Sequence, residues 1–361
     1  MAKRHVVNAN FLSKIRRCQE IIMARSGADD LYEIIKIIFL KKHFGESVCY
    51  KQMNNFLLDS ADLIERFVDG DAQLIIDEML FLDCWDILDG EDVENLDYYT
   101  FDAVFEELTS HKYKSNKGQY FTPRNIVDFC VESLNIQKGS RVCDPACGSS
   151  AFLKSAFDYL NGSVELYGFD ISPRAIKVSN LMSYLLCENA IYLNQRDSLD
   201  TNFGNERYDV ILTNPPFAGD VTDSNYVKNF VLSRDRKGKI ERDVLFLEKC
   251  VSLLNDNGKL AIVLPDNKVS SVRFSYVRDW LIKNINVRAV VSLNSNTFKP
   301  YTSQKAVVIF AQKEQCENNK VSFYISDQSG KNSSGEFFVK DGVIQDDLSP
   351  IKDDIKLLWG N

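Results

Sequence analysis

The sequence lacks the patterns that mark several classes of protein. Its nine cysteines are scattered, and no Cys/His cluster has the spacing of metal ligands, so we expect a reduced protein without a metal site. No apolar stretch of signal-peptide length opens the chain, and the densest apolar run, Leu31 to Leu40, is interrupted by Glu33 and Lys36. These absences predict a cytoplasmic protein that does not enter membranes.

Basic residues are almost absent from one part of the chain, although the net charge is only -8. Residues 59–107 hold seventeen acidic side chains and a single basic one, Arg66, whereas residues 1–58 hold ten basic and five acidic ones. The acidic block is either a solvated helical surface or a face for a basic protein partner. Two basic stretches, His111 to Arg124 and Lys228 to Arg242, suit contacts with nucleic-acid phosphates.

The pattern of apolar residues divides the chain into three parts. From Phe11 to about Leu108 they recur at helical spacing, which predicts an all-α N-terminal domain over residues 1–110. After a linker at Ser110 to Gly118, short apolar runs alternate with longer amphipathic ones over residues 111–313, as in βαβ units with a parallel sheet. Residues 314–361 are expected to form a short C-terminal extension.

Seven strands are expected in the second part. We place them at Ser140–Asp144, Val164–Ile171, Ala190–Asp197, Tyr208–Thr213, Lys259–Leu264, Val287–Leu293 and Ala306–Gln312. Helices fit between most of them, at Ser149–Tyr159, Pro173–Cys187, Val244–Leu254 and Val272–Ile282. Because only Asn294 to Lys305 separates the last two strands, too little for a crossover helix, the last strand should run antiparallel and form an edge with its neighbour.

The most informative motif is Asn214-Pro215-Pro216-Phe217, which follows the fourth predicted strand. Proline has no N–H donor and holds the residue before it extended, so the strand ends there and Asn214 lies at a carboxyl edge, where ligands usually bind. The side-chain oxygen of Asn214 and the carbonyl of Pro215 can both accept from one amino group, and Phe217 can stack on the ring that carries it. A plain strand-ending turn with a core Phe is the alternative.

Acidic residues follow the first three strands. Asp144 precedes a turn of small residues, and the helix start beyond it offers N–H groups to a carboxylate, while Asp144 suits a cationic amine. The glycine fingerprint of dinucleotide-binding loops is absent. Asp170 lies 26 residues later, a spacing at which an acid commonly binds ribose hydroxyls. Ile171 can lie on an adenine ring, and Asp197 can accept from its amino group. Each acid alone is as compatible with a helix cap or a surface position.

These motifs carry a family resemblance. The run Asp144 to Phe152 followed by Asn214 to Phe217 resembles the S-adenosylmethionine-dependent N6-adenine DNA methyltransferases, and Gly118 to Arg124 resembles the element that closes over the methionine end of their cofactor. Asp30 to Lys42 and Phe101 to Leu108 resemble the N-terminal domain of type I restriction-modification M subunits. The resemblance implies a bacterial or archaeal α/β protein with a seven-stranded, Rossmann-like methyltransferase sheet whose last strand is antiparallel.

The resemblance also implies roles for individual residues. The catalytic residues would be Asn214, Pro215, Pro216 and Phe217. The cofactor-binding residues would be Gln119, Tyr120, Phe121, Thr122, Asp144, Pro145, Ala146, Gly148, Ser149, Ser150, Asp170, Ile171, Asp197, Ser198 and Asn214. Ser150 stands where the family frequently has a second glycine. The contacts with DNA would come from Lys228, Arg234, Arg236, Lys237 and Lys239, for which an ordinary solvated loop is the alternative.

The implied reaction is transfer of the methyl group of S-adenosylmethionine to N6 of an adenine flipped out of double-stranded DNA. Fewer than fifty residues follow the last predicted sheet strand, so the resemblance implies that a separate specificity subunit selects the site and that a restriction subunit accompanies it where present. Two other functions fit the same motif. One is an amino-methyltransferase acting on RNA or on a protein glutamine, and the other is a non-catalytic scaffold that binds cofactor and partner.

Overall fold

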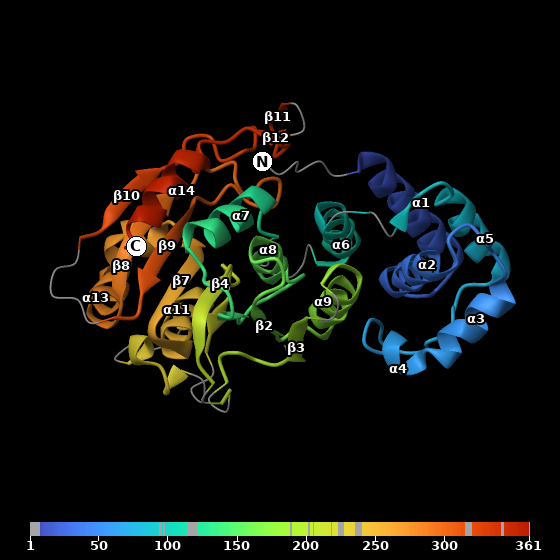
Figure 1. The fold of residues 1–361 in the computed structure, drawn as a ribbon, viewed down its shortest axis with the longest axis horizontal. Helices are drawn as coiled ribbons and strands as arrows, with labels where there is room; N and C mark the ends of the chain where they lie inside the picture. Colours follow the sequence, from blue (N-terminus) through green and yellow to red (C-terminus); the bar gives the residue numbers. More distant parts are fainter. Residues whose placement is uncertain are drawn as a thin grey trace. The chain divides into compact units, whose positions relative to one another are not determined.

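The structure is a computed structural model that describes most of the chain (Figure 1). The described residues are 8–93, 96, 98–113, 121–187, 190–200, 203–204, 206–217, 219–222, 227–234, 240–314, 320–340 and 343–360, without the side chains of 107 and 109–113. The chain divides into two compact units. The helical unit comprises the described residues within 6–115 and 173–189, and the sheet unit comprises those within 116–172 and 190–361.

The helical unit is all-α in its described residues. Its helices are α1 (Ala9–Arg25), α2 (Asp30–Phe44), α3 (Tyr50–Asp59), α4 (Ala61–Ile64), α5 (Glu78–Ile87), α6 (Tyr98–Tyr113) and α9 (Pro173–Leu186). Helix α6 continues to Tyr113, so the linker expected from Ser110 begins too early in the prediction. Among the described residues, no helix combines the length and the apolar character that crossing a membrane requires.

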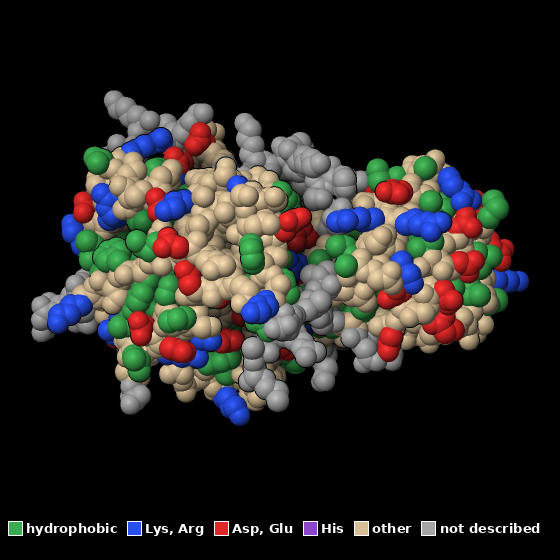
Figure 2. All heavy atoms as spheres, turned by 90° about the horizontal axis from the view of Figure 1, so that it is seen from above, with side chains coloured by type: hydrophobic (Ala, Val, Ile, Leu, Met, Phe, Trp, Pro, Cys, Tyr) green, Lys and Arg blue, Asp and Glu red, His purple; other side chains and the backbone are tan. Residues whose placement is uncertain are grey.

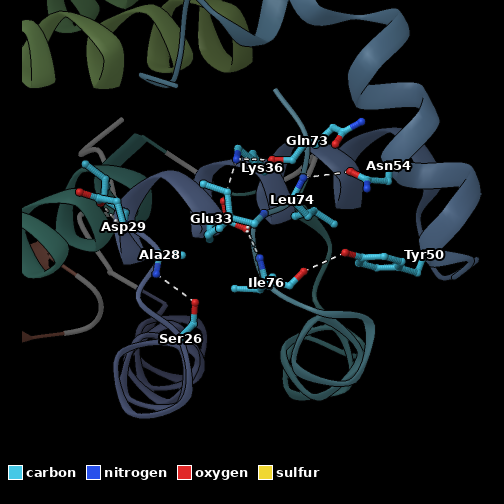
Figure 3. Close-up of polar contacts among 12 residues, drawn as sticks. Ser26, Ala28, Asp29, Glu33, Lys36, Tyr50, Asn54, Gln73, Leu74 and Ile76 are labelled. Atoms are coloured by element: carbon cyan, nitrogen blue, oxygen red, sulfur yellow. Dashed lines mark hydrogen bonds and ion pairs between the residues drawn. The ribbon is translucent and has the colours of Figure 1, made fainter. Parts of the chain in front are cut away.

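Helix α2 is buried along most of its length, including the two charged residues that interrupt its apolar run. Glu33 and Lys36 are 0% and 1% exposed, and their side chains pair over 2.7 Å. The other carboxylate oxygen of Glu33 accepts from the backbone N–H groups of Ile75 and Ile76, and Lys36 also donates to the carbonyl of Gln73 (Figure 3). The buried pair therefore stabilises the irregular segment before α5, because each charge has partners away from water.

Helix α9 lies within residues 111–313 of the predicted catalytic domain, but its contacts place it in the helical unit. The guanidinium of Arg174 donates to both carboxylate oxygens of Asp29, the N-cap of α2, over 2.7 and 2.9 Å. Farther along, Tyr184 packs against Phe39, His43 and Phe67. The boundary between the units is therefore discontinuous in sequence.

The acidic block of residues 59–107 lies in this unit. Figure 2, in which the helical unit is on the right, shows Asp and Glu side chains interspersed with Lys and Arg on the visible face. Two of these acids, Asp83 and Glu91, pair with Arg25 and Lys14 of α1. This arrangement favours the solvated-surface interpretation, because two basic residues of α1 already pair with acids of the block.

The sheet unit is built on one eight-stranded sheet in the order β10-β8-β9-β7-β4-β1-β2-β3. Its strands are β1 (Arg141–Asp144), β2 (Glu165–Asp170), β3 (Ile191–Gln195), β4 (Tyr208–Thr213), β7 (Leu254–Pro265), β8 (Asn286–Ser292), β9 (Ala306–Gln312) and β10 (Ser322–Ile325). Two short ribbons lie outside it, β5 (Asp220–Val221) with β6 (Ile240–Glu241) and β11 (Val339–Lys340) with β12 (Val343–Ile344). The predicted alternation of strands and helices is confirmed.

The predicted antiparallel pairing of the last two strands is confirmed, and one strand that was not predicted lies beyond them. β8 and β9 pair antiparallel as predicted, but β9 also pairs antiparallel with β7 and so lies between them. β10 then adds an eighth strand, parallel to β8. β9 is therefore the reversed strand of an otherwise parallel sheet, and it lies inside the sheet because both of its edges find partners.

Helices cover both faces of the sheet. They are α7 (Arg124–Ser133), α8 (Ala151–Tyr159), α11 (Arg242–Leu253), α12 (Asn267–Ser270), α13 (Ser275–Asn284) and α14 (Leu348–Leu357). Phe310 of β9 meets Phe129 of α7, whereas its neighbour Ile309 belongs to a core cluster with residues of α11 and α13. Successive side chains of a strand point to opposite faces, so α7 lies on one face and α11 and α13 lie on the other.

The C-terminal residues belong to the sheet unit. β10 extends the sheet, and α14 packs on α7, where the indole N–H of Trp359 donates to the carbonyl of Ser133 over 2.6 Å. Lys352 of the same helix pairs with Glu132 over 2.8 Å. The described residues within 314–361, a range expected as an extension, thus complete one edge and one helical layer of this unit.

Candidate active site

Four neighbouring parallel strands bring the predicted site residues to one edge of the sheet. β1 lies between β4 and β2, and β3 flanks β2. Asp144 and Asp170 are the last residues of β1 and β2, and Asn214 follows the last residue of β4. Asp197 comes two residues after β3. Because the carboxyl ends of parallel strands meet at the same edge, residues scattered over more than seventy positions form one site.

The turn after β1 has the backbone of a glycine-rich loop. Gly148 has φ +53°, and Ser150, the N-cap of α8, has φ +68°. A serine pays a steric cost in this left-handed region, where glycine is favoured, and the position is the one at which the resembling family often has glycine. Ser150 is fully buried, and its N–H donates to the carbonyl of Cys147 over 2.7 Å. The fold therefore imposes the loop conformation even without the second glycine.

Neighbouring strand ends hold this loop in place. The N–H of Cys147 donates to the carbonyl of Phe169 on β2 over 2.9 Å, and the hydroxyl of Ser198 beyond β3 donates to the carbonyl of Pro145 over 2.6 Å. Ser198, predicted as a cofactor ligand, thus supports the loop. The N–H of Leu199 donates to one carboxylate oxygen of Asp197 over 2.9 Å.

The carboxylate of Asp170 is oriented by backbone donors. One oxygen accepts from the N–H of Gly148 over 3.1 Å and the other from the N–H of Ser172 over 2.8 Å. Burial raises the pKa of Asp170, and these amides oppose the shift. The next side chain, Ile171, is 60% exposed, which is unusual for a large apolar residue and leaves its surface open at the ligand edge.

Asp144 is 1% exposed and accepts from the N–H of Ala146 over 3.0 Å. Burial raises the pKa of Asp144 from its ordinary value of 3.8 to about 7. The Thr213 hydroxyl and the Ala146 N–H oppose this shift, whereas the nearby charge of Asp170 adds to it. A buried carboxyl with a raised pKa is poised to bind a cationic group, because the cation would restore the ionised form.

Asn214 is connected to the segment that precedes α7. Its side-chain N–H donates to Oγ1 of Thr122 over 2.9 Å. This bond fixes the orientation of the amide, and therefore the direction in which the side-chain oxygen can accept. Asn214 is half-buried, Pro215 and Phe217 are buried, and Thr122 is 9% exposed. Of the predicted element over 119–122, Thr122 is thus brought to the Asn214 edge and Phe121 directly precedes it, while Gln119 and Tyr120 lie outside the described residues.

The comparisons with known proteins agree with this geometry. Residues 98–349 match the N-6 DNA methylase family. The chain belongs to that family. The methylase subunit of the type I restriction enzyme EcoEI from Escherichia coli is 28% identical over 245 residues, which are 63% of this chain and 49% of that subunit. The chain spans about half the length of the curated relatives it matches.

Solved structures show the same fold as this N-6 DNA methylase. The methyltransferase subunit of a type I restriction-modification system from Streptococcus thermophilus superposes with a TM-score of 0.69 at 17% identity, covering 98% of this chain and 94% of that one. A structure described as a class I S-adenosylmethionine-dependent methyltransferase from Listeria monocytogenes has a TM-score of 0.65 at 17% identity and covers 96% and 99%. The predicted methyltransferase fold is confirmed.

An aromatic neighbour of the motif was missed in the sequence. Phe298, 1% exposed, lies in the connection between β8 and β9 and meets the ring of Phe217 edge-on, with centroids 5.4 Å apart. The sequence offered one signal for this residue, because the connection after β8 is too short for a crossover helix and starts at the carboxyl end of that strand. Only the pairing of β9 between β7 and β8 brings that connection to the Asn214 edge.

The segment predicted to contact DNA is only partly described. Lys228 and Arg234 are exposed, and Arg236, Lys237 and Lys239 lie outside the described residues. The base of this segment in the N-6 DNA methylase is closed by the β5–β6 ribbon and by the N–H of Arg242, which donates to the carbonyl of Gly219 over 3.0 Å. The two ends of the segment therefore lie side by side, one just after Phe217 and the other at the start of α11.

Proposed function

We propose that this N-6 DNA methylase transfers the methyl group of S-adenosylmethionine to N6 of adenine in DNA, as the modification subunit of a type I-like restriction-modification system. The observation that carries the proposal is the position of Asn214-Pro-Pro-Phe217 at the carboxyl end of β4, beside Asp144 and Asp170 on adjacent strands. The family match over residues 98–349 supports it.

The strand ends fit S-adenosylmethionine. Asp170, already oriented by two amides, would accept from the ribose hydroxyls, and the exposed side chain of Ile171 would lie on the adenine ring, with Asp197 at its amino group. The loop Pro145 to Ser150 and the raised-pKa carboxyl of Asp144 would hold the amino-acid end, together with Phe121 and Thr122. The absence of the three-glycine fingerprint agrees with a ligand that has no pyrophosphate.

The acceptor groups would act on the target amine. Its lone pair is delocalised into the ring, so acceptors for both of its hydrogens favour a pyramidal, nucleophilic nitrogen. The side-chain oxygen of Asn214 and the carbonyl of Pro215 supply these acceptors, Pro216 keeps the turn rigid, and Phe217 stacks on the base with Phe298 behind it. The bound cofactor supplies an activated methyl group on a sulfonium. Positioning then dominates, and aligned reactants lower a barrier by about 7–11 kcal/mol.

A base within a duplex does not reach such an edge, so the target adenine would be flipped out, at a cost of a few kcal/mol. The basic segment that leaves the sheet after Phe217, with Lys228, Arg234, Arg236, Lys237 and Lys239, would contact the phosphates around it. Site selection would come from a separate specificity subunit, and a restriction subunit would join where a nuclease is present. The named type I methylase subunits among the relatives support this assembly.

The test is single-molecule mapping of N6-methyladenine in the genome of the source organism, with the intact gene, with Asn214→Ala and with Asn284→Ala, which alters an exposed asparagine of α13. Loss of methylation at one DNA motif in Asn214→Ala alone supports the proposal. Identical maps for all three genes, in cells that produce the protein, overturn the assignment of DNA as substrate. Transfer of labelled methyl groups to RNA or to a protein glutamine by the purified chain would overturn it as well.

A further inference from the structure

Two stretches after β10, residues 326–330 and 346–347, contact both sides of the candidate active site. We call them the brace. The two stretches of the brace are joined to each other, because one carboxylate oxygen of Asp347 accepts from the N–H groups of Asp327 and Gln328 over 2.8 and 3.1 Å. The N–H of Ser326 donates to the carbonyl of Ser292 at the end of β8 over 2.8 Å, which joins the brace to the sheet.

On one side the brace holds the start of α7. The side-chain N–H groups of Asn125, which is 6% exposed, donate to the carbonyl of Ser329 over 3.1 Å and to the carboxylate of Asp346 over 2.9 Å. Asn125 comes three residues after Thr122, the partner of Asn214. Gly330 makes room for this amide, since a Cβ on Gly330 would lie 2.7 Å from Nδ2 of Asn125.

On the other side the brace holds the connection that carries Phe298. The hydroxyls of Thr297 and Ser329, which are 0% and 1% exposed, hydrogen-bond to each other, and the Thr297 hydroxyl lies 2.6 Å from the carbonyl of Asn294. The side-chain N–H of Asn294 donates to the carbonyl of Asp327 over 2.7 Å. Thr297 directly precedes Phe298, so this contact lies one residue from the ring that meets Phe217.

One buried residue, Ser329, therefore bonds to both sides, through its carbonyl to the Thr122 segment and through its hydroxyl to the Phe298 connection. These hydrogen bonds are shielded from water. Breaking one leaves a buried donor or acceptor without a partner, which costs free energy, so the contacts hold their geometry. We propose that Ser329, with Thr297 and Asn125, is a positioning residue that fixes the spacing between the Asn214 and Phe298 sides of the base-binding site. This inference rests on the proposed function, since it assigns that site to the target base.

The first experiment compares Thr297→Val, which keeps the shape and removes the hydroxyl, with Thr297→Ser, which keeps the hydroxyl. The full chain is purified with its partner subunit, and DNA from a strain that lacks the gene is methylated. Thr297→Val removes the hydrogen bonds of this hydroxyl to Ser329 and to the carbonyl of Asn294 and should lower kcat about five- to tenfold, with an unchanged Kd for S-adenosylmethionine, and Thr297→Ser should restore kcat. An unaltered kcat in Thr297→Val, or an equal loss in both variants, overturns the inference.

The second experiment does not depend on methylation. Gly330→Ala introduces a Cβ at φ +93° that would lie 2.7 Å from Nδ2 of Asn125 and 2.7 Å from Cγ2 of Ile344, whereas Gly70→Ala introduces one at φ +92° with nothing within 4 Å, so the two variants share the φ angle and differ in these contacts. Amide hydrogen exchange of the ligand-free chain should rise over residues 121–127 and 293–301 in Gly330→Ala only. Equal exchange in the two variants overturns the brace. A wild-type chain that fails to bind S-adenosylmethionine overturns the proposed function instead and leaves the exchange result standing.

Discussion

Asn214 and Thr122, ninety-two positions apart, are joined by a side-chain hydrogen bond of 2.9 Å at the carboxyl edge of the sheet. The bond orients the amide of the motif and connects it to the segment that the sequence assigns to the cofactor. One polar contact thus joins the residue proposed to bind the target amine, Asn214, to the segment proposed to bind the methyl donor, which contains Thr122.

Replacing Thr122 by valine should remove this orientation while keeping the shape. We expect methylation to fall about two- to tenfold, the effect of losing one hydrogen bond of about 0.5–1.5 kcal/mol, with a small change in stability. Thr122→Ser retains the hydroxyl and is the control. Steady-state kinetics with DNA and cofactor varied in turn provides the measurement, and equal kinetics in Thr122→Val and wild type would contradict the role of the bond.

The raised pKa of Asp144 predicts a pH-dependent stability. Between the ordinary value of 3.8 and about 7 the folded chain retains a proton that the unfolded chain has lost, so this group's contribution to stability falls as the pH rises through that window. Asp144→Asn, which cannot ionise, should therefore raise the melting temperature of the ligand-free chain more at pH 8 than at pH 5. Thermal denaturation at both values is the measurement, and an equal shift at the two pH values would contradict the prediction.

Asp144 should also link cofactor binding to protons. A cationic amine beside it lowers its pKa, so binding near pH 6 should release a proton. Calorimetry of S-adenosylmethionine binding in buffers of different ionisation enthalpy measures this release, and Asp144→Asn should abolish it and weaken binding about tenfold or more, about 1.4 kcal/mol. A proton release that persists in Asp144→Asn would assign it to another group.

Gly168 of β2 is expected to reject a side chain. A Cβ there would lie 2.7 Å from Leu193 and 2.9 Å from Leu153, both buried or half-buried, so Gly168→Ala should destabilise the sheet unit by about 1–3 kcal/mol through overpacking. Gly27→Ala is the control, because a Cβ at Gly27 meets nothing within 4 Å. Urea denaturation compares the two, and a Gly168→Ala chain as stable as Gly27→Ala would show that β2 has room.

The buried pair of α2 gives a test of the helical unit (Figure 3). Lys36→Met leaves Glu33 charged and buried without its cation and should cost about 3–5 kcal/mol. Arg25→Met breaks an exposed pair with Asp83 and should cost about 1 kcal/mol or less. Denaturant titration of both variants measures the difference, and a Lys36→Met cost as small as that of Arg25→Met would show that the Glu33 charge is solvated or neutralised.

The sequence by itself determined where strands stop and which residues lie at their ends. β4 and β9 have the predicted bounds, and the remaining predicted strands differ from the observed ones mainly at their ends. These features are local, because apolar periodicity and the geometry around proline depend on residues close together in the chain. The acids of β1 and β2 and the Asn214 motif were found for that reason.

Only the tertiary structure decided which segments meet. It placed β9 between β7 and β8, brought Phe298 to Phe217, assigned α9 to the helical unit and buried Glu33 with Lys36. Each outcome depends on a partner distant in the chain, chosen by how the whole sheet and core bury apolar surface and satisfy polar groups. A local sequence pattern does not specify which distant segment becomes the partner. The contacts of Ser329 with Asn125 and Thr297 likewise join segments that are distant in the chain.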